Sequence, residues 1–400
     1  MNWTISHPVH LLEAIKLSMS QGGNFLKSRV APTGPIAREP NVNYIHKASW
    51  GMYASRVDHE TIAILLDWVE QKALRENGDF FFNEEPSVYK DMQRLYRPLA
   101  FGKVAAWIGH PVIEKPVVID RILQYQHHPS GGVFNYIGND PKNVEQQATI
   151  GPLNTTFFGH LMVALDFTEQ AVKAGEWCRR FVEANWEHMS RGVIYTQMTP
   201  TGDLITEVAL GEKMIKVVDR DSPKQEFWHI GTLMAYFCTL YDTMVSRWGF
   251  SGSKAQPYLD AALELLEFES AMPLDTYLWP SKCKVAWGAG ELLRVLVKHQ
   301  SEDKQSIDKA YRICERVAIF TFMDNQLGNG GWPSMHYPTS ELAPETDLTY
   351  KPLKGLVHIP QQATAGSQSF LLPGEEITGE FLGEMKSVEQ GVEGLISMGR

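Results

Sequence analysis

The sequence predicts an all-helical protein built from repeated helical hairpins, and three observations support this prediction. Apolar residues recur at three- and four-residue spacing along most of the chain, which is the period of an amphipathic helix. Runs typical of strands are scarce. Turns rich in glycine and aromatic residues return at intervals of about fifty residues, which indicates internal repetition.

The helical pattern is clearest in segments of two kinds. Some segments carry charge on one side and so have a solvated face, whereas others are apolar nearly all round and must be enclosed. Residues 169–186 are of the first kind and residues 153–167 of the second. This alternation predicts outer helices packed around inner helices. The segments are 59–74, 95–109, 116–126, 153–167, 169–186, 226–249, 255–270, 285–300 and 306–326.

The glycine and aromatic turns follow the outer kind of helix. They lie at 77–82, 130–136, 191–196 and 328–337, with a glycine-free relative at 273–279. A helical hairpin that cannot bury its apolar face alone must stack on its neighbours. With a first hairpin before residue 77, the chain holds five or six such units. A closed ring fits them better than an open solenoid, because polar capping helices are not evident at either end.

The chain is expected to form a single domain over residues 1–400. After residue 338 the helical pattern gives way to a stretch rich in Pro, Thr and Gly. We therefore expect residues 338–400 to form a loop-rich segment that covers one mouth of the ring. A disordered tail is the alternative for this segment.

Composition and charge exclude several classes of function. A chain of 400 residues with 44% hydrophobic and 21% charged residues can bury a large core. A net charge of -10 without a cluster of Lys and Arg argues against a nucleic-acid partner. No secretion signal and no segment long enough to span a membrane is recognisable, so we expect a cytoplasmic protein. The sequence leaves a homodimer open.

Sequence motifs for metals and nucleotide cofactors are missing. The adjacent His127 and His128 point apart, and no zinc-binding spacing accompanies them. No glycine-rich phosphate loop follows a strand. The cysteines form no CxxC pair, which is typical of buried, reduced thiols. These cysteines are Cys178, Cys238, Cys283 and Cys314. We expect a protein that acts without a metal and without a cofactor.

Two short motifs give the chain a resemblance to known proteins. In QLGNGGW, residues Gln326, Gly330 and Trp332 match the Q-x3-G-x-W repeat of squalene-type cyclases. Trp287, followed four residues later by Glu291, is similar to a pattern of the N-acylglucosamine 2-epimerase family. Together with the helical repeats, the chain resembles the α/α toroid superfamily, which also includes protein prenyltransferases and six-hairpin glycosidases. The resemblance implies an (α/α)5–6 toroid with its active site at the centre.

Two histidines are candidates for acid–base catalysis. His160 and His229 each lie among apolar residues in an inner type of helix, at similar places in successive units. Burial favours the neutral imidazole, which is available as a general base. Core histidines whose nitrogens are satisfied by hydrogen bonds are the alternative.

Glu291 is the third catalytic candidate. It follows Gly288 and Gly290, which leave room for another backbone or for a ligand. Burial among aliphatic residues would raise the pKa of its carboxyl group, as suits a general acid. The alternative is a carboxylate paired with Arg294 on the same helix face.

Aromatic side chains are abundant, with 11 Trp, 14 Tyr and 18 Phe. Such side chains shape an apolar substrate, stabilise a carbocation or stack on a sugar ring, although core packing uses them as well. The residues expected to contact a substrate are Tyr136, Phe157, Trp228, Trp279, Trp287, Trp332, His336 and Tyr337.

These features favour a cofactor-independent cyclase or isomerase acting on a small, largely apolar metabolite of the terpenoid or polyketide kind. One alternative is a carbohydrate-active enzyme on the same scaffold, either a sugar epimerase, a glycoside hydrolase or a lyase. Another is a non-catalytic binding protein made of helical repeats. A centre lined by several carboxylates would favour the carbohydrate alternative over the apolar substrate.

Overall fold

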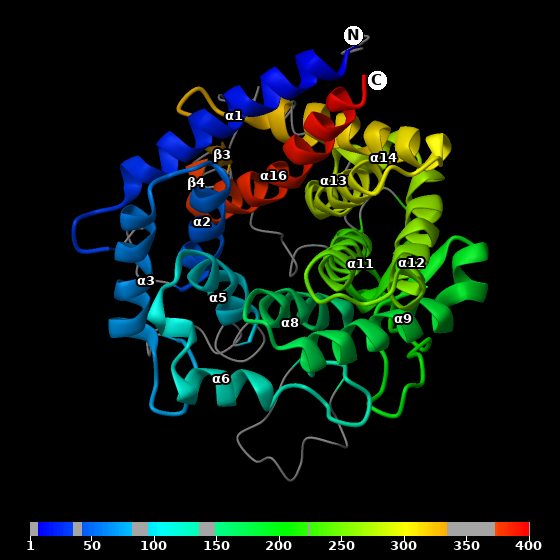
Figure 1. The fold of residues 1–400 in the computed structure, drawn as a ribbon, viewed down its shortest axis with the longest axis horizontal. Helices are drawn as coiled ribbons and strands as arrows, with labels where there is room; N and C mark the ends of the chain where they lie inside the picture. Colours follow the sequence, from blue (N-terminus) through cyan, green and yellow to red (C-terminus); the bar gives the residue numbers. More distant parts are fainter. Residues whose placement is uncertain are drawn as a thin grey trace.

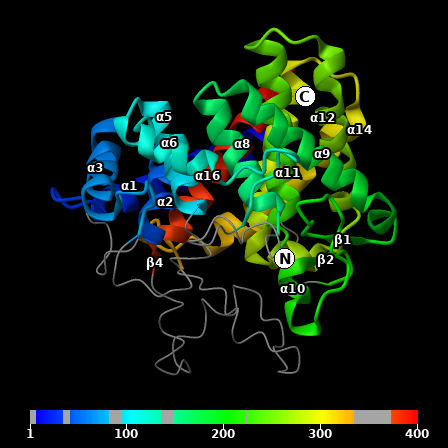
Figure 2. The ribbon, with the colours of Figure 1, turned by 90° about the horizontal axis from the view of Figure 1, so that it is seen from below.

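The computed structural model describes residues 7–34, 42–81, 95–135, 149–222, 225–333 and 373–399. Within these ranges the chain is mostly helical, with a few very short strands (Figures 1 and 2). The prediction of an all-helical protein is confirmed. None of the helices in these ranges is both long enough and apolar enough to cross a lipid bilayer.

One set of helices lies around the centre of the view in Figure 1, and we call them the inner helices. Each packs against the next one along the chain, and the last of them packs against the first. Nearly every residue of α8 is buried, as its uniformly apolar sequence predicts. The inner helices are α2 (Val42–Ala54), α5 (Tyr96–Ile108), α8 (Pro152–Ala164), α11 (Trp228–Ser246), α13 (Cys283–Lys298) and α16 (Glu375–Ser397).

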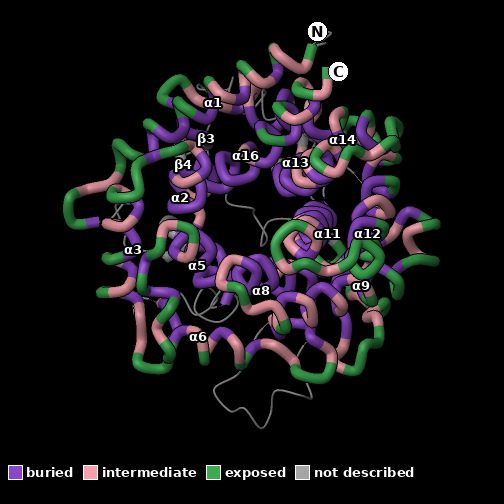
Figure 3. Tube along the Cα trace, viewed as in Figure 1, coloured by how far each residue is buried: buried purple, intermediate pink, exposed green. Residues whose placement is uncertain are grey.

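The outer helices lie between the inner helices and solvent. Helices α3, α9, α12 and α14 pack on α2, α8, α11 and α13, and the first helix, α1, packs on α16. Their outward sides are exposed, whereas the inner helices are buried (Figure 3). The outer helices are α1 (Pro8–Arg29), α3 (His59–Ala73), α6 (Pro116–Leu123), α9 (Thr168–Ser190), α12 (Gly252–Ser270) and α14 (Lys304–Val317).

Local sequence signals set several helix ends. The Asp58 side chain accepts a hydrogen bond of 2.9 Å from the Thr61 amide and so caps α3. Asp303 caps α14 in the same way. Proline stands in the first turn of α1, α6 and α8, where its missing N–H is no loss. Helix α5 ends at Gly109, whose φ of 71° is left-handed.

The strands are short and peripheral. β1 (Val193–Tyr195) pairs antiparallel with β2 (Val217–Asp219), next to the single-turn helix α10 (Lys213–Lys216). β3 (Trp332–Pro333) pairs antiparallel with β4 (Pro373–Gly374), which leads directly into α16. The second pair therefore joins the turn after α14 to the start of the last inner helix.

The predicted glycine turns share one conformation. A Cβ at Gly330, in the turn after α14, would lie 2.4 Å from the carbonyl oxygen of Gln21 in α1. Glycines in the turns after α3 and α6 meet carbonyl groups of α6 and α9 in the same way. The turns after α3 and α6 therefore rest on the backbones of α6 and α9, and the turn after α14 rests on that of α1, whereas a Cβ at Gly192 would meet the Arg220 side chain. The glycines are Gly78, Gly131, Gly192 and Gly330, with φ of 85°, 78°, 84° and 90°.

The C-terminal part of the chain differs from the expectation of a loop-rich segment over 338–400. Residues 375–397 form the long inner helix α16. The other residues of that segment up to 372 lie outside the described ranges. Glycines made α16 look unlike a helix in the sequence, but they are sites of close contact. A Cβ at Gly379 would lie 2.3 Å from the Lys47 carbonyl oxygen, and one at Gly383 would lie 2.4 Å from the Trp50 ring.

Candidate functional site

Charged side chains from three inner helices meet where α16 packs against α2 and α13, and we call them the charged cluster. Its members are Lys47 of α2, Lys284 of α13, and Glu376, Glu380 and Glu384 of α16. The Lys47 ammonium lies 2.8 Å from Glu376 and 2.8 Å from Glu380. The Lys284 ammonium contacts Glu380 and lies 3.4 Å from Glu384 Oε1. Glu380 is thus held between two ammonium groups.

The spacing of the three glutamates explains how one helix supplies them. Glu376, Glu380 and Glu384 follow one another at four-residue intervals, which puts their side chains on one face of α16. Three carboxylates in a row on an exposed helix would repel each other. Here the two lysines of α2 and α13 lie against that face and neutralise part of the charge. The E-x3-E-x3-E pattern was the sequence signal for this cluster.

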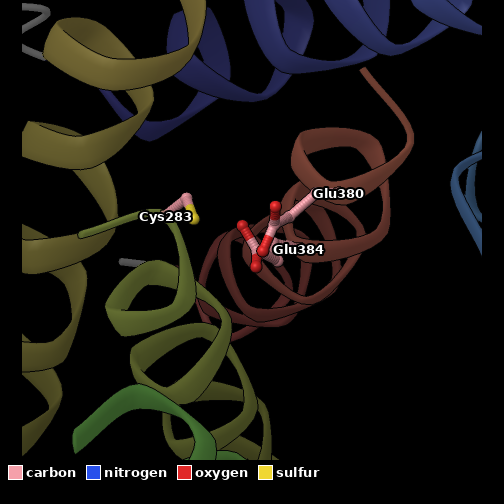
Figure 4. Close-up of side chains that lie close together, drawn as sticks. All are labelled: Cys283, Glu380 and Glu384. Carbon is pink, nitrogen blue, oxygen red and sulfur yellow. The ribbon is translucent and has the colours of Figure 1, made fainter. Parts of the chain in front are cut away.

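A cysteine joins the cluster at the start of α13. The Cys283 sulfur and carboxylate oxygens of Glu380 and Glu384 lie within 4.8 Å of one another (Figure 4). Burial raises the pKa of the Cys283 thiol well above its usual value, so the group is protonated and uncharged. These donor types could hold a metal ion. Lys284 already supplies a cation to both carboxylates, so the cluster has a counter-ion within the protein.

Two carboxyl groups near Lys284 carry oxygen atoms without a hydrogen-bond partner. Within the described residues, both oxygens of Glu384 and Oε2 of Glu226, which stands just before α11, are buried and accept no hydrogen bond, although Glu384 Oε1 lies 3.4 Å from Lys284 Nζ. Burial raises the pKa of Glu226 to about 8, and the nearby charge of Lys284 opposes this rise. Burial also raises the pKa of Glu384, again opposed by Lys284. Both groups therefore exchange protons at higher pH than an ordinary glutamate.

Three aromatic rings from different inner helices meet across the centre, and we call them the aromatic triad. Trp50 of α2 lies 6.2 Å from Phe157 of α8 and 5.1 Å from Trp287 of α13, measured between ring centroids. Phe157 and Trp287 are 5.5 Å apart. The sequence analysis predicted Phe157 and Trp287 as substrate contacts, and the structure brings these two together.

Lys103 of α5 lies against the triad. Its ammonium nitrogen is 4.1 Å from the centroid of Trp50, 4.8 Å from Trp287 and 5.4 Å from Phe157. The residue is only 2% exposed. Burial lowers the pKa of Lys103 to about 7, and the charges of Glu291 and Glu384 oppose this shift. The sequence analysis passed over Lys103, although a lysine flanked on both sides by apolar residues of α5 was a visible signal.

His160 stacks on the triad. Its ring lies 4.9 Å from Trp287 at an interplanar angle of 26°, and it meets Tyr236 edge-on at 5.3 Å. Its Nε2 is buried without a hydrogen-bond partner. Burial lowers the pKa of His160 well below its usual value, and the charge of Lys103 lowers it further. The imidazole is neutral, as predicted, but such a low pKa makes it a weak base.

His229 lies elsewhere in its helix. It is the second residue of α11, whereas His160 stands well inside α8, so the two do not occupy similar places. Trp228 Nε1 donates a 3.0 Å hydrogen bond to His229 Nε2, while Nδ1 is buried. Burial lowers the pKa of His229 to about 3. It too is a weak base, and its contact with Trp228 joins two predicted site residues.

Glu291 matches the alternative given from the sequence, in which its carboxylate is paired with Arg294. Its carboxylate lies 2.9 Å from Arg294 and accepts a 2.6 Å hydrogen bond from Ser387. The two glycines before it, Gly288 and Gly290, are sites where the backbones of α11 and α16 approach. Glu291 is therefore part of the packing between α13 and α16, with both carboxylate oxygens occupied by Arg294 and Ser387.

Trp332 packs between helices and is fully buried. Its Nε1 donates a 2.7 Å hydrogen bond to the Phe322 carbonyl oxygen, and its amide donates to Thr378. Its ring meets Phe381 edge-on at 5.9 Å. A Cβ at Gly22 of α1 would lie 2.8 Å from the ring. The side chain thus joins α1 to α16, and its predicted place at a substrate rim is corrected to helix packing.

Of the remaining residues predicted to contact a substrate, one is described by the structure and three are not. Trp279 is partly buried just before α13, with Nε1 buried and without a partner. Tyr136, His336 and Tyr337 lie outside the described residues. The structure therefore gathers Phe157, His160 and Trp287 at the centre and leaves Trp332 in the packing between α1 and α16.

Comparison with known proteins leaves the family open, since no protein-family model matches the chain and no curated protein is significantly similar to it.

Proposed function

We propose that the chain is an (α/α)6 toroid of the kind that the sequence resembles, with its active site at the charged cluster. The packing of each inner helix on the next, and of α16 on α2, supports a closed ring. Side chains from opposite helices meet at the centre of such a ring. The charged cluster and the aromatic triad both draw on helices that are far apart in the sequence.

We further propose that the protein is an isomerase or epimerase for a small, polyhydroxylated carbonyl compound of the sugar class. The observation that carries this proposal is a pair of buried carboxyl groups: Glu226 Oε2 and both oxygens of Glu384 accept no hydrogen bond within the described residues, and Glu384 Oε1 lies 3.4 Å from the Lys284 ammonium. A buried carboxyl without a partner is costly to maintain, so such groups are typical of sites where a substrate supplies the partner.

The proposed chemistry assigns a role to each group. Glu384, ionised, removes a proton from the carbon next to the substrate carbonyl. Glu226, whose pKa of about 8 keeps it protonated at neutral pH, donates a proton to the product. The intermediate carries negative charge on oxygen, and the Lys284 ammonium stabilises it. The charge of Lys284 affects the pKa of both carboxyls, so it lies near both of them.

The carboxylates also separate the proposed substrate classes. An apolar metabolite would have to displace water from several charged groups without replacing their hydrogen bonds. A sugar offers hydroxyl groups that donate to them. The aromatic faces that would have stabilised a carbocation are instead turned toward the Lys103 amine. We therefore favour the carbohydrate alternative over a terpenoid or polyketide substrate.

Solvent exchange tests this proposal. The protein is incubated in D2O with a panel of aldoses, ketoses, N-acyl hexosamines and uronic acids, and proton NMR records deuterium uptake next to the carbonyl. Replacing Glu384→Gln or Glu226→Gln should reduce the rate by about two to four powers of ten. The matched control is Glu393→Gln, a carboxylate on the same helix that is 55% exposed and paired with Lys16.

The outcomes distinguish the alternatives. Exchange that is lost in both cluster variants and kept in Glu393→Gln supports the proposal. Conversion of a terpenoid or polyketide probe at a rate unaffected by Glu384→Gln would favour the apolar substrate. Tight sugar binding without any exchange or conversion would favour the non-catalytic binding protein.

A further inference from the structure

We propose that Lys103 is a reactive amine that forms an imine with small aldehydes or ketones. The residue is only 2% exposed, yet within the described residues its Nζ atom contacts aromatic rings and makes no hydrogen bond and no ion pair. A buried lysine in a folded protein is ordinarily paired with a carboxylate. The missing partner is what sets Lys103 apart.

A comparison within the same chain shows the difference. Lys282 is fully buried and also faces aromatic rings, with Nζ 3.9 Å from the Phe227 centroid and 4.9 Å from that of Tyr277. Its ammonium, however, contacts Glu269, which is equally buried. Lys282 is thus an ion-paired lysine whose Nζ is occupied. Lys103 has aromatic faces around it and no hydrogen-bond acceptor among the described residues.

The surroundings of Lys103 determine which ligand it can take. The charged and titratable groups that influence it are Glu291 and Lys284 on α13, Glu384 on α16 and His160 on α8. Burial holds the pKa at about 7, so about half of the amine is uncharged at neutral pH and carries a free electron pair. An anionic ligand would face the negative faces of the aromatic rings and is disfavoured.

A neutral carbonyl compound, unlike an anion, is not disfavoured by the aromatic faces and can react with the uncharged amine. The Nζ electron pair attacks the carbonyl carbon, and a proton passes from nitrogen to oxygen to give a neutral carbinolamine. A proton from solvent then leaves with the hydroxyl group as water, and the nitrogen electron pair forms the C=N bond of a protonated imine. No oxidant or reductant is needed. The imine keeps a positive charge where the ammonium had been, against the faces of Trp50 and Trp287, which stabilise a cation. The aromatic triad therefore stabilises the protonated imine as well as the ammonium form of Lys103.

Trp107 of α5 also faces Lys103. The Trp107 ring lies 5.2 Å from Nζ, and the residue is 41% exposed. The proposal does not rest on the sugar isomerase proposed above, because imine formation is measured on the resting protein without turnover.

Reductive trapping tests the proposal. The whole protein is treated at pH 7 with glycolaldehyde and cyanoborohydride, which reduces an imine to a stable secondary amine, and peptide mapping by mass spectrometry locates the modified lysines. At pH 7 an ordinary surface lysine is uncharged in only about one molecule in a few thousand. We expect Lys103 to be modified at least about tenfold faster than exposed lysines such as Lys27, and Lys282 to stay unmodified.

Two results would overturn the proposal. One is an unmodified Lys103 while exposed lysines carry the label. The other is equal labelling of Lys103 and Lys282, because burial alone would then account for both. In Lys103→Arg, which keeps the cation but removes the nucleophile, the fast labelling phase should vanish. The mapping of the unaltered protein decides the question even if that variant fails to fold.

Discussion

At the scale of single residues, burial has opposite consequences for acids and bases at the centre of this molecule. It raises the pKa of Glu226 to about 8 and lowers that of His229 to about 3. The carboxyl is thereby brought toward neutral pH, where general acids work best, and the imidazole is moved away from it. For this reason the proposed acid and base are glutamates rather than the two histidines.

The pKa of Glu226 leads to a prediction about pH. An acid must be protonated to donate, so its contribution is present below its pKa and lost as the pH rises through it. The exchange rate should fall about tenfold per pH unit above pH 8, because Glu226 titrates at about 8. The rate is measured by deuterium uptake between pH 6 and 10.

The matched variants identify the group responsible. Glu226→Gln should show a low rate without this decline, because the titrating group has been removed. Glu393→Gln, on the exposed side of α16, should decline like the unaltered protein. A decline that persists unchanged in Glu226→Gln would assign the acid to another residue.

At the scale of helices, close backbone contacts hold the inner helices in register. A Cβ at Gly379 of α16 would lie 2.3 Å from the carbonyl oxygen of Lys47, and one at Gly231 of α11 would lie 2.0 Å from that of Lys284. Each glycine thus touches the backbone of a cluster lysine. The helix spacing that packs the core also sets the positions of both ammonium groups.

Replacing Gly379→Ala should destabilise the protein by about 1–3 kcal/mol or more, since neither backbone can move aside without separating α2 from α16. The unfolding free energy is measured in urea. Gly252→Ala is the control, because this helical glycine at the start of α12 has no atom within 4 Å of an added Cβ. It should be neutral or stabilising by up to about 1 kcal/mol. Equal effects of the two changes would contradict the close-contact explanation.

The same glycines show why the sequence predicted some helices and missed another. Residues 153–167 and 169–186 were recognised because their apolar and charged patterns are strong, and α8 and α9 cover them closely. Helix α16 contains Gly379, Gly383, Gly391 and Gly394, each of which costs a helix about 1 kcal/mol relative to alanine. Their value lies in contacts with distant segments, which local patterns do not contain.

The candidate site was predicted in part for a related reason. Phe157, His160 and Trp287 belong to helices that were recognised, and the structure brings them together. The glutamates of the charged cluster were missed because they lie on α16. Because these glutamates were not recognised, the inner helices looked apolar in the sequence. The sequence analysis therefore favoured an apolar substrate. The role of Lys47 and Lys284 as ion-pair partners of these glutamates is visible only once α2, α13 and α16 are known to be adjacent.

At the scale of the whole molecule, the two ends of the chain meet. Helix α1 packs on α16, and Arg29 lies 3.0 Å from Glu375. The turn after α14 rests on Gln21 of α1 through Gly330, and Trp332 fills the space between α1 and α16. The glycine turn near the end of the repeats thus has a structural purpose, because it connects the last outer helix to the first.

A closed ring predicts a specific chemical crosslink. Lys16 of α1 and Glu393 of α16 are 377 positions apart in the sequence, yet their side chains lie 2.9 Å apart. Both are accessible to a carbodiimide, since they are 41% and 55% exposed. The reagent joins a lysine and a glutamate only where they touch. We expect an amide between Lys16 and Glu393 in the monomeric protein, identified by mass spectrometry of the linked peptides.

A second ion pair supplies the control for that crosslink. Lys309 of α14 and Glu267 of α12 lie 2.5 Å apart and join neighbouring outer helices, so their amide forms whether or not the ring is closed. Glu393→Gln should remove the first crosslink and keep the second. An open arrangement would give the Lys309 crosslink alone in the monomer. If Lys16 and Glu393 were linked only between two copies, the chain ends would be exchanged between molecules, and the single-chain ring would be wrong.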